Sequence, residues 1–306
     1  MKNTLIALLV VLVVGFGAYF LIQSSSSKVP VTPEKQGITT DTKPADNTQK
    51  APAQTAPVDK TQTVIGTSVG GNKITAYHYG EGASELLFVS GIHGGYEWNT
   101  VLVLYQLMDY LKANPDVVPK NVKVTVIPVL NPDGLNKVVG TTGRFSPKDV
   151  SSSQDVVVSG RFNANTVDLN RNFDCDWQAT GKWQTKTVSG GSAAFSEPES
   201  QAIKNYVETN KPAAVVVWYS AAGGVFSSNC HSGVSTQTKT LTKLFADASL
   251  YPAYESFDFY AITGDMVNWL AKNDIPAISV LLTNHTDTEW TKNLAGISAL
   301  LKYYTK

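Results

Sequence analysis

Hydrophobic and polar positions divide this chain of 306 residues into three parts. Residues Thr4 to Ile22 form an apolar run without a charge, close to the roughly 20 residues that span a bilayer as a helix. Residues 24–62 are rich in Ser, Thr, Pro, Lys, Asp, Gln and Ala, so they cannot bury enough apolar surface to offset the entropy of ordering. The pattern predicts a transmembrane anchor over 1–23, a disordered linker over 24–62 and one globular domain over 63–306.

A cleavable signal peptide is the alternative interpretation of the first segment. Its apolar core would be shorter, about 7–15 residues, and followed by a small-x-small cleavage site. No convincing site precedes the segment Gln23 to Ser27. Lys2 and Lys28 nearly balance across the run, but a short N-terminus before a long domain favours export of that domain. We therefore expect a single-pass protein of the cell membrane with an extracytoplasmic domain.

Apolar stretches with strand and helix periods alternate through the domain. A hairpin is predicted over 63–69 and 73–79, and further strands over 86–90, 121–130, 213–220 and 275–282. Helices are predicted from a cap at Asn99, from the capping box Ser196 to Glu199, and over 238–250, 263–269 and 289–304. The segment Asn131 to Gly134 has the composition of a turn. This order predicts an α/β domain with a mixed, mostly parallel sheet sandwiched by helices.

Charge and cysteine content add two expectations. The formal net charge is zero, and no basic stripe suggests a nucleic-acid partner. The two cysteines, Cys175 and Cys230, are able to pair outside the cytoplasm. We expect this disulfide because each cysteine lies next to a candidate site segment; two buried free thiols are the alternative.

Two segments carry candidate chemistry. His93 and Glu97 follow the strand over 86–90 on a glycine-rich turn, where they can converge on one Zn²⁺. The alternative is a loop histidine near a helix-capping glutamate. Arg171 stands between two asparagines, and such a fork suits bidentate capture of a carboxylate. The alternative there is an arginine tied down by its neighbour Asp168. Ligands in an α/β fold bind beyond the carboxyl ends of the strands, where these residues are expected to lie.

Four motifs occur in a fixed order along the domain. They are His-Gly-Gly-Tyr-Glu from His93, Asn-Pro-Asp-Gly from Asn131, Val-Asp-Leu-Asn-Arg-Asn-Phe from Val167 and Phe-Ser-Glu-Pro-Glu from Phe195. Together they resemble the zinc metallocarboxypeptidases, the carboxypeptidase A-like enzymes, over about residues 91–301. The resemblance implies a zinc carboxypeptidase-like fold, a Zn²⁺ cofactor and action on the C-terminus of a peptide or cell-wall peptide.

The resemblance also implies roles for individual residues. His93 and Glu97 match the first two zinc ligands, although one residue more than the usual His-x-x-Glu spacing separates them, which puts the placement of Glu97 in question. Asn170 and Arg171 match the pair that grips the substrate's terminal carboxylate. Three further residues match other parts of the site: Arg161 is the arginine that polarises the scissile carbonyl, with Arg144 as a weaker candidate, and Tyr260 is the mobile tyrosine that closes over substrate.

The chain departs from the family pattern at two positions. Tyr219 stands where the family has its third zinc ligand, a histidine, and phenolate is a poor ligand because its pKa is near 10. Leu281 stands where the family has its general-base glutamate, and a register shifted by one gives Leu282. We therefore expect a weakened zinc site. Four nearby residues are candidates to replace the missing zinc ligand or base: His231, His285, Asp287 and Glu289. The alternative is that they are surface loop residues and a helix cap.

Three functions are compatible with these features. The first is a membrane-tethered zinc carboxypeptidase with a variant site that acts on C-terminal residues of extracytoplasmic peptides or cell-wall peptides. The second is an inactive relative that binds the carboxylate of a peptide C-terminus through Asn170, Arg171 and Arg161. The third is a scaffolding domain without a ligand, against which the retained arginine and asparagine residues argue.

Overall fold

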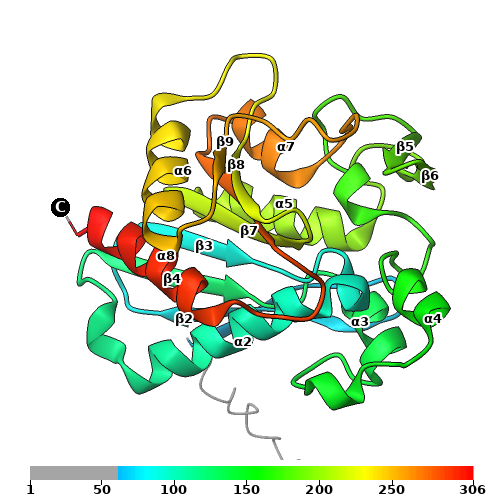
Figure 1. Ribbon diagram of the computed structural model, residues 1–306, viewed down its shortest axis with the longest axis horizontal. Helices are drawn as coiled ribbons and strands as arrows, with labels where there is room; N and C mark the ends of the chain where they lie inside the picture. Colours follow the sequence, from blue (N-terminus) through cyan, green and yellow to red (C-terminus); the bar gives the residue numbers. More distant parts are fainter. Residues whose placement is uncertain (1–60, 306) are drawn as a thin grey trace, which may run out of the picture. The chain divides into compact units, whose positions relative to one another are not determined.

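The structure is a computed structural model that describes residues 61–305 (Figure 1). The predicted anchor over 1–23 and all but the end of the predicted linker lie outside the described residues. Within residues 61–305, no helix has the length and apolar character needed to cross a membrane.

A mixed sheet forms the centre of the domain. Its strands lie in the order β1-β2-β4-β3-β7-β10-β8-β9. The middle strands β4, β3, β7 and β10 are parallel, β1 and β2 add an antiparallel hairpin at one edge, β8 runs antiparallel to β10, and β9 is parallel to β8. The strand bounds are β1 Gln62–Thr67, β2 Lys73–Tyr79, β3 Ser84–Val89, β4 Val122–Ile127, β7 Ala214–Ser220, β8 Gly224–Ser227, β9 Ala253–Tyr254 and β10 Ala277–Leu282.

Helices cover both faces of the sheet because its central strands are apolar on both sides. In β3, Leu86 and Phe88 face one core, while Leu87 and Val89 face the other. The first core includes side chains of α2 (Trp98–Ala113), α6 (Thr236–Ser249) and α8 (Trp290–Tyr303), which gather on one side of the sheet (Figure 1). The second includes those of α5 (Pro198–Asn210) and α7 (Met266–Lys272). The prediction of a mixed sheet between helices is confirmed.

The long segment between β4 and α5 contains short elements that the sequence pattern did not indicate. They are α3 (Pro132–Val139), α4 (Gln154–Ser159), the 3-10 turn η4 (Leu169–Arg171) and a small hairpin of β5 (Thr180–Trp183) and β6 (Lys186–Ser189). The predicted turn at Asn131 is wrong in kind, because Asn131 caps α3 by accepting a hydrogen bond from the Gly134 amide at 2.8 Å. Strands β8 and β9 were not predicted.

The two caps predicted at Asn99 and Ser196 do not cap helices α2 and α5 in the structure. Helix α2 begins at Trp98, so Asn99 lies inside its first turn and does not cap it. Its buried amide instead donates to the carbonyls of Asn284 and Asp287, at 2.8 and 3.0 Å. Helix α5 begins at Pro198 after Glu197, without a side-chain cap.

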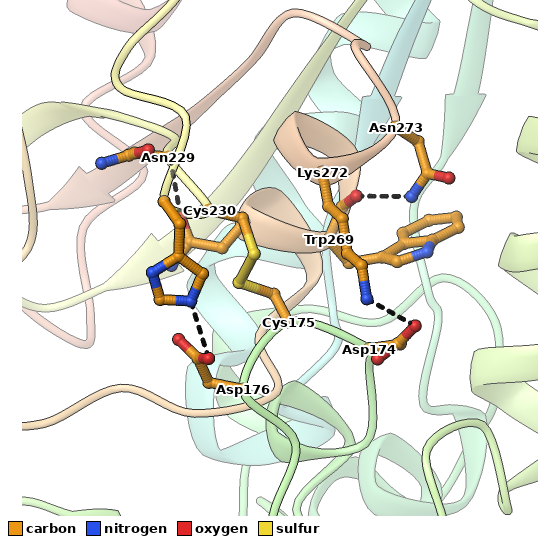
Figure 2. The surroundings of a disulfide bond; sticks show 10 residues. Asp174, Cys175, Asp176, Asn229, Cys230, Trp269, Lys272 and Asn273 are labelled. Carbon is orange, nitrogen blue, oxygen red and sulfur yellow. Dashed lines mark hydrogen bonds and ion pairs between the residues drawn. A yellow bond between two sulfur atoms is a disulfide. The ribbon is translucent and has the colours of Figure 1, made fainter.

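A disulfide joins Cys175 to Cys230, as the sequence analysis expected, with the Cα atoms 6.1 Å apart (Figure 2). It ties the loop after η4 to the loop after β8. Beside it, Asp174 forms an ion pair of 2.9 Å with Lys272 of α7 (Figure 2). The disulfide therefore fixes two segments that border the carboxyl ends of the central strands.

Candidate active site

One cavity of about 570 Å³ lies where the central parallel strands end. Residues after β3, at the end of β7 and at the end of β10 reach it, because parallel strands bring their carboxyl ends to the same edge. Apart from the weaker candidate Arg144, its lining includes the residues that the sequence analysis assigned to the metal, the substrate and the two substituted positions: His93, Glu97, Arg161, Asn170, Arg171, Tyr219, Tyr260 and Leu281.

The extra residue between His93 and Glu97 is taken up by a 3-10 turn, η1 (Gly94–Glu97). Gly94 makes this turn possible with φ +46°, and a Cβ atom there would lie 2.6 Å from the Gly160 carbonyl oxygen. The turn brings the Glu97 side chain next to His93. Glu97 Oε1 lies 2.9 Å from His93 Nδ1, and both side chains are buried. The longer spacing is thus compatible with a shared site.

The donor atoms of His93 and Glu97 fit a cation. Nε2 of His93 lies 3.4 Å from Asp168 Oδ1, and Nδ1 lies 2.9 Å from Glu97 Oε1. No described residue forms a hydrogen bond to either ring nitrogen or to Glu97 Oε2, although all three atoms are buried. A buried imidazole nitrogen next to a carboxylate is a donor set that suits two positions of Zn²⁺.

Asp168 is the anchor of this arrangement. Burial raises the pKa of its carboxyl, but the Arg161 guanidinium and the His93 imidazole outweigh burial and hold that pKa far below its usual range. Arg161 contributes two contacts, from Nε at 2.9 Å and Nη2 at 2.8 Å to Asp168 Oδ2. The carboxylate therefore orients the imidazole on one side and the guanidinium on the other.

Tyr219 does not complete the metal site in this structure. Its hydroxyl donates to Asn170 Oδ1 at 3.3 Å. Burial, Asp265 and Glu97 raise the pKa of the phenol well above its usual range, so it stays neutral. A neutral phenol engaged with an amide is a hydrogen-bond donor, and a poor ligand for Zn²⁺.

Leu281 lies beside Tyr219 on the neighbouring strand, in register with it. Leu281 lines the cavity, whereas Leu282 packs into the core on the other face of the sheet. The alignment that places Leu281 at the general-base position is thus the one in which the side chain faces the site. This position holds no group that takes up a proton.

The two candidate arginines for the scissile carbonyl lie in different surroundings. Arg161 is buried in the cavity wall, with its guanidinium 4.5 Å from the ring centre of Trp183 and Nη1 3.9 Å from Glu97 Oε1. Arg144 is half exposed, pairs with Asp109 and does not line the cavity. Arg161 is therefore the arginine that a substrate in this cavity meets.

Asn170 and Arg171 are fixed by hydrogen bonds, and each keeps N–H groups without an acceptor among the described residues. Asn170 Oδ1 accepts from the Met266 amide at 3.0 Å as well as from Tyr219, and no described residue accepts from its Nδ2. Arg171 donates from Nε and Nη2 to the Lys182 carbonyl and from Nη1 to the Asn170 carbonyl. Since a guanidinium has five N–H groups, two remain for a ligand. The proposed tether to Asp168 is absent, because Asp168 bonds to the Asn170 amide and to Arg161.

The far side of the cavity holds unpartnered acceptors. Asp265 and Asn229 both line it, and no described residue donates to Asp265 Oδ1 or Asn229 Oδ1, although both atoms are buried. Burial raises the pKa of Asp265 to about 6, although Arg171 opposes the shift. Tyr260 is half buried in the same wall, and its ring centre lies 6.0 Å from the Arg171 guanidinium carbon.

The structure separates the four candidates for replacing the missing zinc ligand or base. His285 lines the cavity and packs against Tyr96, with ring centres 4.8 Å apart. His231 is exposed, lies 2.8 Å from Asp176 and is outside the cavity. Glu289 and Asp287 are also outside it: Glu289 bonds to Thr283 and Tyr251, and Asp287 to the loop before it. In the described part of the chain, the potential ligand atoms of Cys175, Cys230 and His231 all lie within 4.8 Å of one another, but the two sulfurs are joined in a disulfide.

The sequence analysis did not name Asp265, and it left a surface loop position open as the alternative for His285. Asp265 lies after Tyr260 and is the residue directly before α7. The signal available for Asp265 was a carboxylate directly after a Thr-Gly turn in an otherwise apolar segment. Nothing local to His285 distinguishes it from a loop residue.

Comparison with known proteins gives consistent matches. The sequence profile of the family described as zinc carboxypeptidase matches residues 46–286. A zinc carboxypeptidase of Simulium vittatum is 28% identical over 169 residues, which are 53% of this chain and 52% of that protein. Gamma-D-glutamyl-L-diamino acid endopeptidase 1 of Lysinibacillus sphaericus is 26% identical over 221 residues, 65% of this chain and 55% of that protein. This chain thus spans about half the length of these two relatives.

Among solved structures, murein-tripeptide amidase MpaA from Escherichia coli O157 superposes with a TM-score of 0.55 at 20% identity. The match covers 79% of this chain and 91% of that one. At this identity the comparison demonstrates a shared fold.

Proposed function

Because this chain belongs to the zinc carboxypeptidase family, we propose that its domain binds the free C-terminus of a peptide and hydrolyses the last peptide bond. One observation carries the proposal. Arg171 lines the cavity with 1% of its surface exposed, and it forms no ion pair with a carboxylate of the described residues. Asp265 acts on Arg171 only from beyond ion-pair distance. A buried guanidinium with no carboxylate in direct contact is costly, so an anion from outside is the partner that this arginine lacks.

A terminal carboxylate matches the remaining donors. Arg171 has two N–H groups left, and Asn170 Nδ2 is turned toward the same space because its Oδ1 is fixed by Tyr219 and Met266. Arg161 has free N–H groups on Nη1 for the carbonyl of the last peptide bond. Zn²⁺ held by His93 and Glu97 would supply a Lewis acid that polarises this carbonyl.

The unpartnered acceptors indicate the class of side chain at the substrate's end. Asp265 and Asn229 offer two buried oxygens without donors. A cationic side chain with several N–H groups, such as an amine or guanidinium, satisfies both and neutralises Asp265. The relative from Lysinibacillus sphaericus is named for a diamino acid, whose second amino group is a cation of this kind. A peptide, including one from the cell wall, that ends in a basic residue is therefore our proposed substrate.

We also propose that residues 1–23 anchor the protein in the cell membrane and that residues 24–62 tether the domain on the extracytoplasmic side. The support is the uncharged apolar run and the polar, proline-containing stretch that follows it. Fractionation of cells that express the full chain tests this, with protease added outside. Loss of the domain from intact cells is the expected result, and a protected domain contradicts the proposal.

Arg171→Ala tests the carboxylate site. Removing one partner of a buried charge pair costs about 2–5 kcal/mol, so affinity for a free-acid peptide should fall roughly 30- to 4,000-fold. The matched control is Arg144→Ala, which removes a half-exposed arginine outside the cavity and should leave the affinity unchanged. Calorimetry with free-acid and C-terminally amidated forms of one peptide measures both. Equal affinity of the unaltered protein for the two forms contradicts the proposal.

Binding without hydrolysis is the second candidate function. It is favoured by Leu281, which supplies no base at the position of the family's glutamate. It is also favoured by Tyr219, whose neutral phenol is a poor ligand at the position of the family's third zinc ligand. Release of free amino acid from a peptide by the Zn²⁺-loaded protein separates the two candidates. Tight binding of free-acid peptides with no release at high protein concentration selects the binding function.

A further inference from the structure

We propose that His285 is a catalytic residue whose Nε2 takes the proton of the attacking water, in place of the carboxylate absent at Leu281. This inference rests on the proposed function. The water oxygen forms a bond to the carbonyl carbon of the last peptide bond while its proton moves to Nε2. The C–N bond then breaks, and the amine nitrogen takes the proton from Nε2. The products are a shortened peptide acid and a free amino acid.

A chain of hydrogen bonds fixes which nitrogen of His285 carries the proton. The Asn99 amide nitrogen donates to the carbonyls of Asn284 and Asp287, which turns Asn99 Oδ1 toward Ser220. Ser220 Oγ donates to that oxygen at 3.1 Å. Its only proton is then used, so Ser220 Oγ accepts from His285 Nδ1 at 3.0 Å. His285 is therefore protonated on Nδ1, and Nε2 carries a lone pair.

The free nitrogen belongs to the cavity. No described residue forms a hydrogen bond to His285 Nε2, and the ring lines the same cavity as His93, Glu97 and Leu281. The Tyr96 ring packs against the imidazole and limits its movement. This is the arrangement of an oriented base: one ring nitrogen is held by a neighbour, and the other has no hydrogen-bond partner among the described residues.

The charges around His285 support the neutral form. Burial lowers the pKa of His285; Glu97 opposes this shift, and His93 and Arg161 add to it. A neutral imidazole is the form that accepts a proton at neutral pH.

The geometry favours a base over a third metal ligand. Among the described residues, the ligand atoms of His93, Glu97 and His285 do not converge within 4.8 Å of one another. Direct ligation of one ion by all three side chains would therefore require the loop after β10 to move. A base needs less: because His285 lines the same cavity as His93 and Glu97, a water molecule in that cavity has room between them.

The test compares the original full chain with three single variants. His285→Asn keeps an N–H donor near the position of Nδ1 but has no atom at Nε2; His285→Ala removes both. His231→Ala is the control, since His231 is exposed and outside the cavity. Both His285 variants should lower kcat about 100- to 10,000-fold, the usual contribution of a general base. Their Zn²⁺ affinity and their affinity for free-acid peptide should stay within about threefold of the original, because hydrogen bonds to uncharged partners contribute modestly.

A second measurement is independent of turnover. The chain has four histidines, so ¹⁵N spectra of the imidazoles give few signals, and the His285 signal is the one that disappears in His285→Ala. The expected signal is that of a neutral ring protonated on Nδ1. Ser220→Ala should change this tautomer and lower kcat without changing KM, as expected for a positioning residue.

Each outcome is decisive for His285. A proton on Nε2, an unchanged kcat in His285→Asn, or loss of Zn²⁺ in His285→Ala overturns the assignment, the last because it makes His285 a ligand. If the original protein binds free-acid peptides but releases no amino acid, the assignment of His285 fails while carboxylate recognition stands. If it does not bind them, the proposed function itself fails.

Discussion

Replacing Asp265 by asparagine should stabilise the ligand-free domain at neutral pH. Burial raises the pKa of Asp265 from 3.8 to about 6, against the opposing effect of Arg171. Such a shift means that ionised Asp265 costs the folded state about 3 kcal/mol relative to the unfolded chain. Asparagine has nearly the same shape and no charge, so we expect Asp265→Asn to raise the free energy of unfolding at pH 7 by about 1–3 kcal/mol, net of its own desolvation.

The sign of the pH dependence follows from the same shift. A carboxyl whose pKa is higher in the folded than in the unfolded state binds more protons when folded, so its contribution to stability falls as pH rises from about 4 to 6. Above pH 6 the full cost is present, and below pH 4 it is absent. The difference between Asp265→Asn and the original domain should therefore be largest above pH 6 and vanish below pH 4.

Urea unfolding at pH 4 and pH 7 measures this difference directly. Asp247→Asn is the matched control: it removes an exposed carboxylate that pairs with Lys243, and surface changes usually stay within about 0.5 kcal/mol. A destabilised Asp265→Asn at pH 7, or a difference independent of pH, would refute the reasoning from burial.

The same carboxylate should select the substrate's side chain. A lysine at the peptide's C-terminus would place its ammonium next to Asp265, where burial has removed water. A buried ion pair of this kind should make the peptide bind about 2–4 kcal/mol more tightly than the same peptide ending in norleucine. Asp265→Asn should abolish that preference while leaving affinity for the norleucine peptide unchanged. The preference should also weaken as pH falls below about 6, where the carboxyl takes up a proton. Equal binding of the two peptides by the original protein at pH 7 would contradict a cationic substrate.

Three further variants test other contacts. Breaking the Cys175–Cys230 disulfide with a Cys175→Ala and Cys230→Ala pair should lower the free energy of unfolding by about 4 kcal/mol for this 55-residue separation, as measured by urea unfolding; a loss below 1 kcal/mol contradicts the estimate. Tyr219→Phe removes the hydroxyl that orients Asn170, so free-acid peptides should bind about 0.5–1.5 kcal/mol more weakly with Zn²⁺ affinity unchanged; a loss of Zn²⁺ would make the phenol a ligand. Tyr219→His with Leu281→Glu should raise both Zn²⁺ affinity and amino-acid release, and no gain in either rejects the alignment.

The layers of the fold could be predicted because the central strands are apolar on both faces. Runs such as 86–90 and 275–282 have no polar alternation, and strands of that kind occur where helices cover both sides of a sheet. The short helices α3 and α4 and the strands β8 and β9 could not be predicted, because segments of a few residues have no measurable period. Asn131 shows the ambiguity: one sequence, Asn-Pro-Asp-Gly, is equally good as a turn and as the capped start of a helix.

The site was predictable where motif and strand end coincide. His93 and Glu97 follow β3 directly, so their place at the edge of the sheet followed from the order of elements. His285 follows β10 in the same way, but its orientation depends on Asn99, which precedes it by 186 positions, counted from 99 to 285. Contacts between residues so far apart leave no local pattern. The sequence alone also did not settle whether the extra residue after His93 displaces Glu97. The turn that keeps Glu97 in place requires Gly94 to lie close to the backbone of Gly160, a contact between segments distant in the sequence.

The two substituted positions belong to one structural unit. Tyr219 and Leu281 are paired in register on adjacent parallel strands, so both side chains point into the cavity from the same patch of the sheet. A charged residue at either position would lie beside the other across one strand spacing, about 4.8 Å. A phenol and a leucine make this patch neutral, and the phenol's hydroxyl is used to fix Asn170. The charged groups of the cavity thereby lie around this patch, with His93, Glu97 and Arg161 in one group and Asp265 and Arg171 in another. A proton acceptor for this site must come from beyond the strand ends, which is where the loop after β10 places His285.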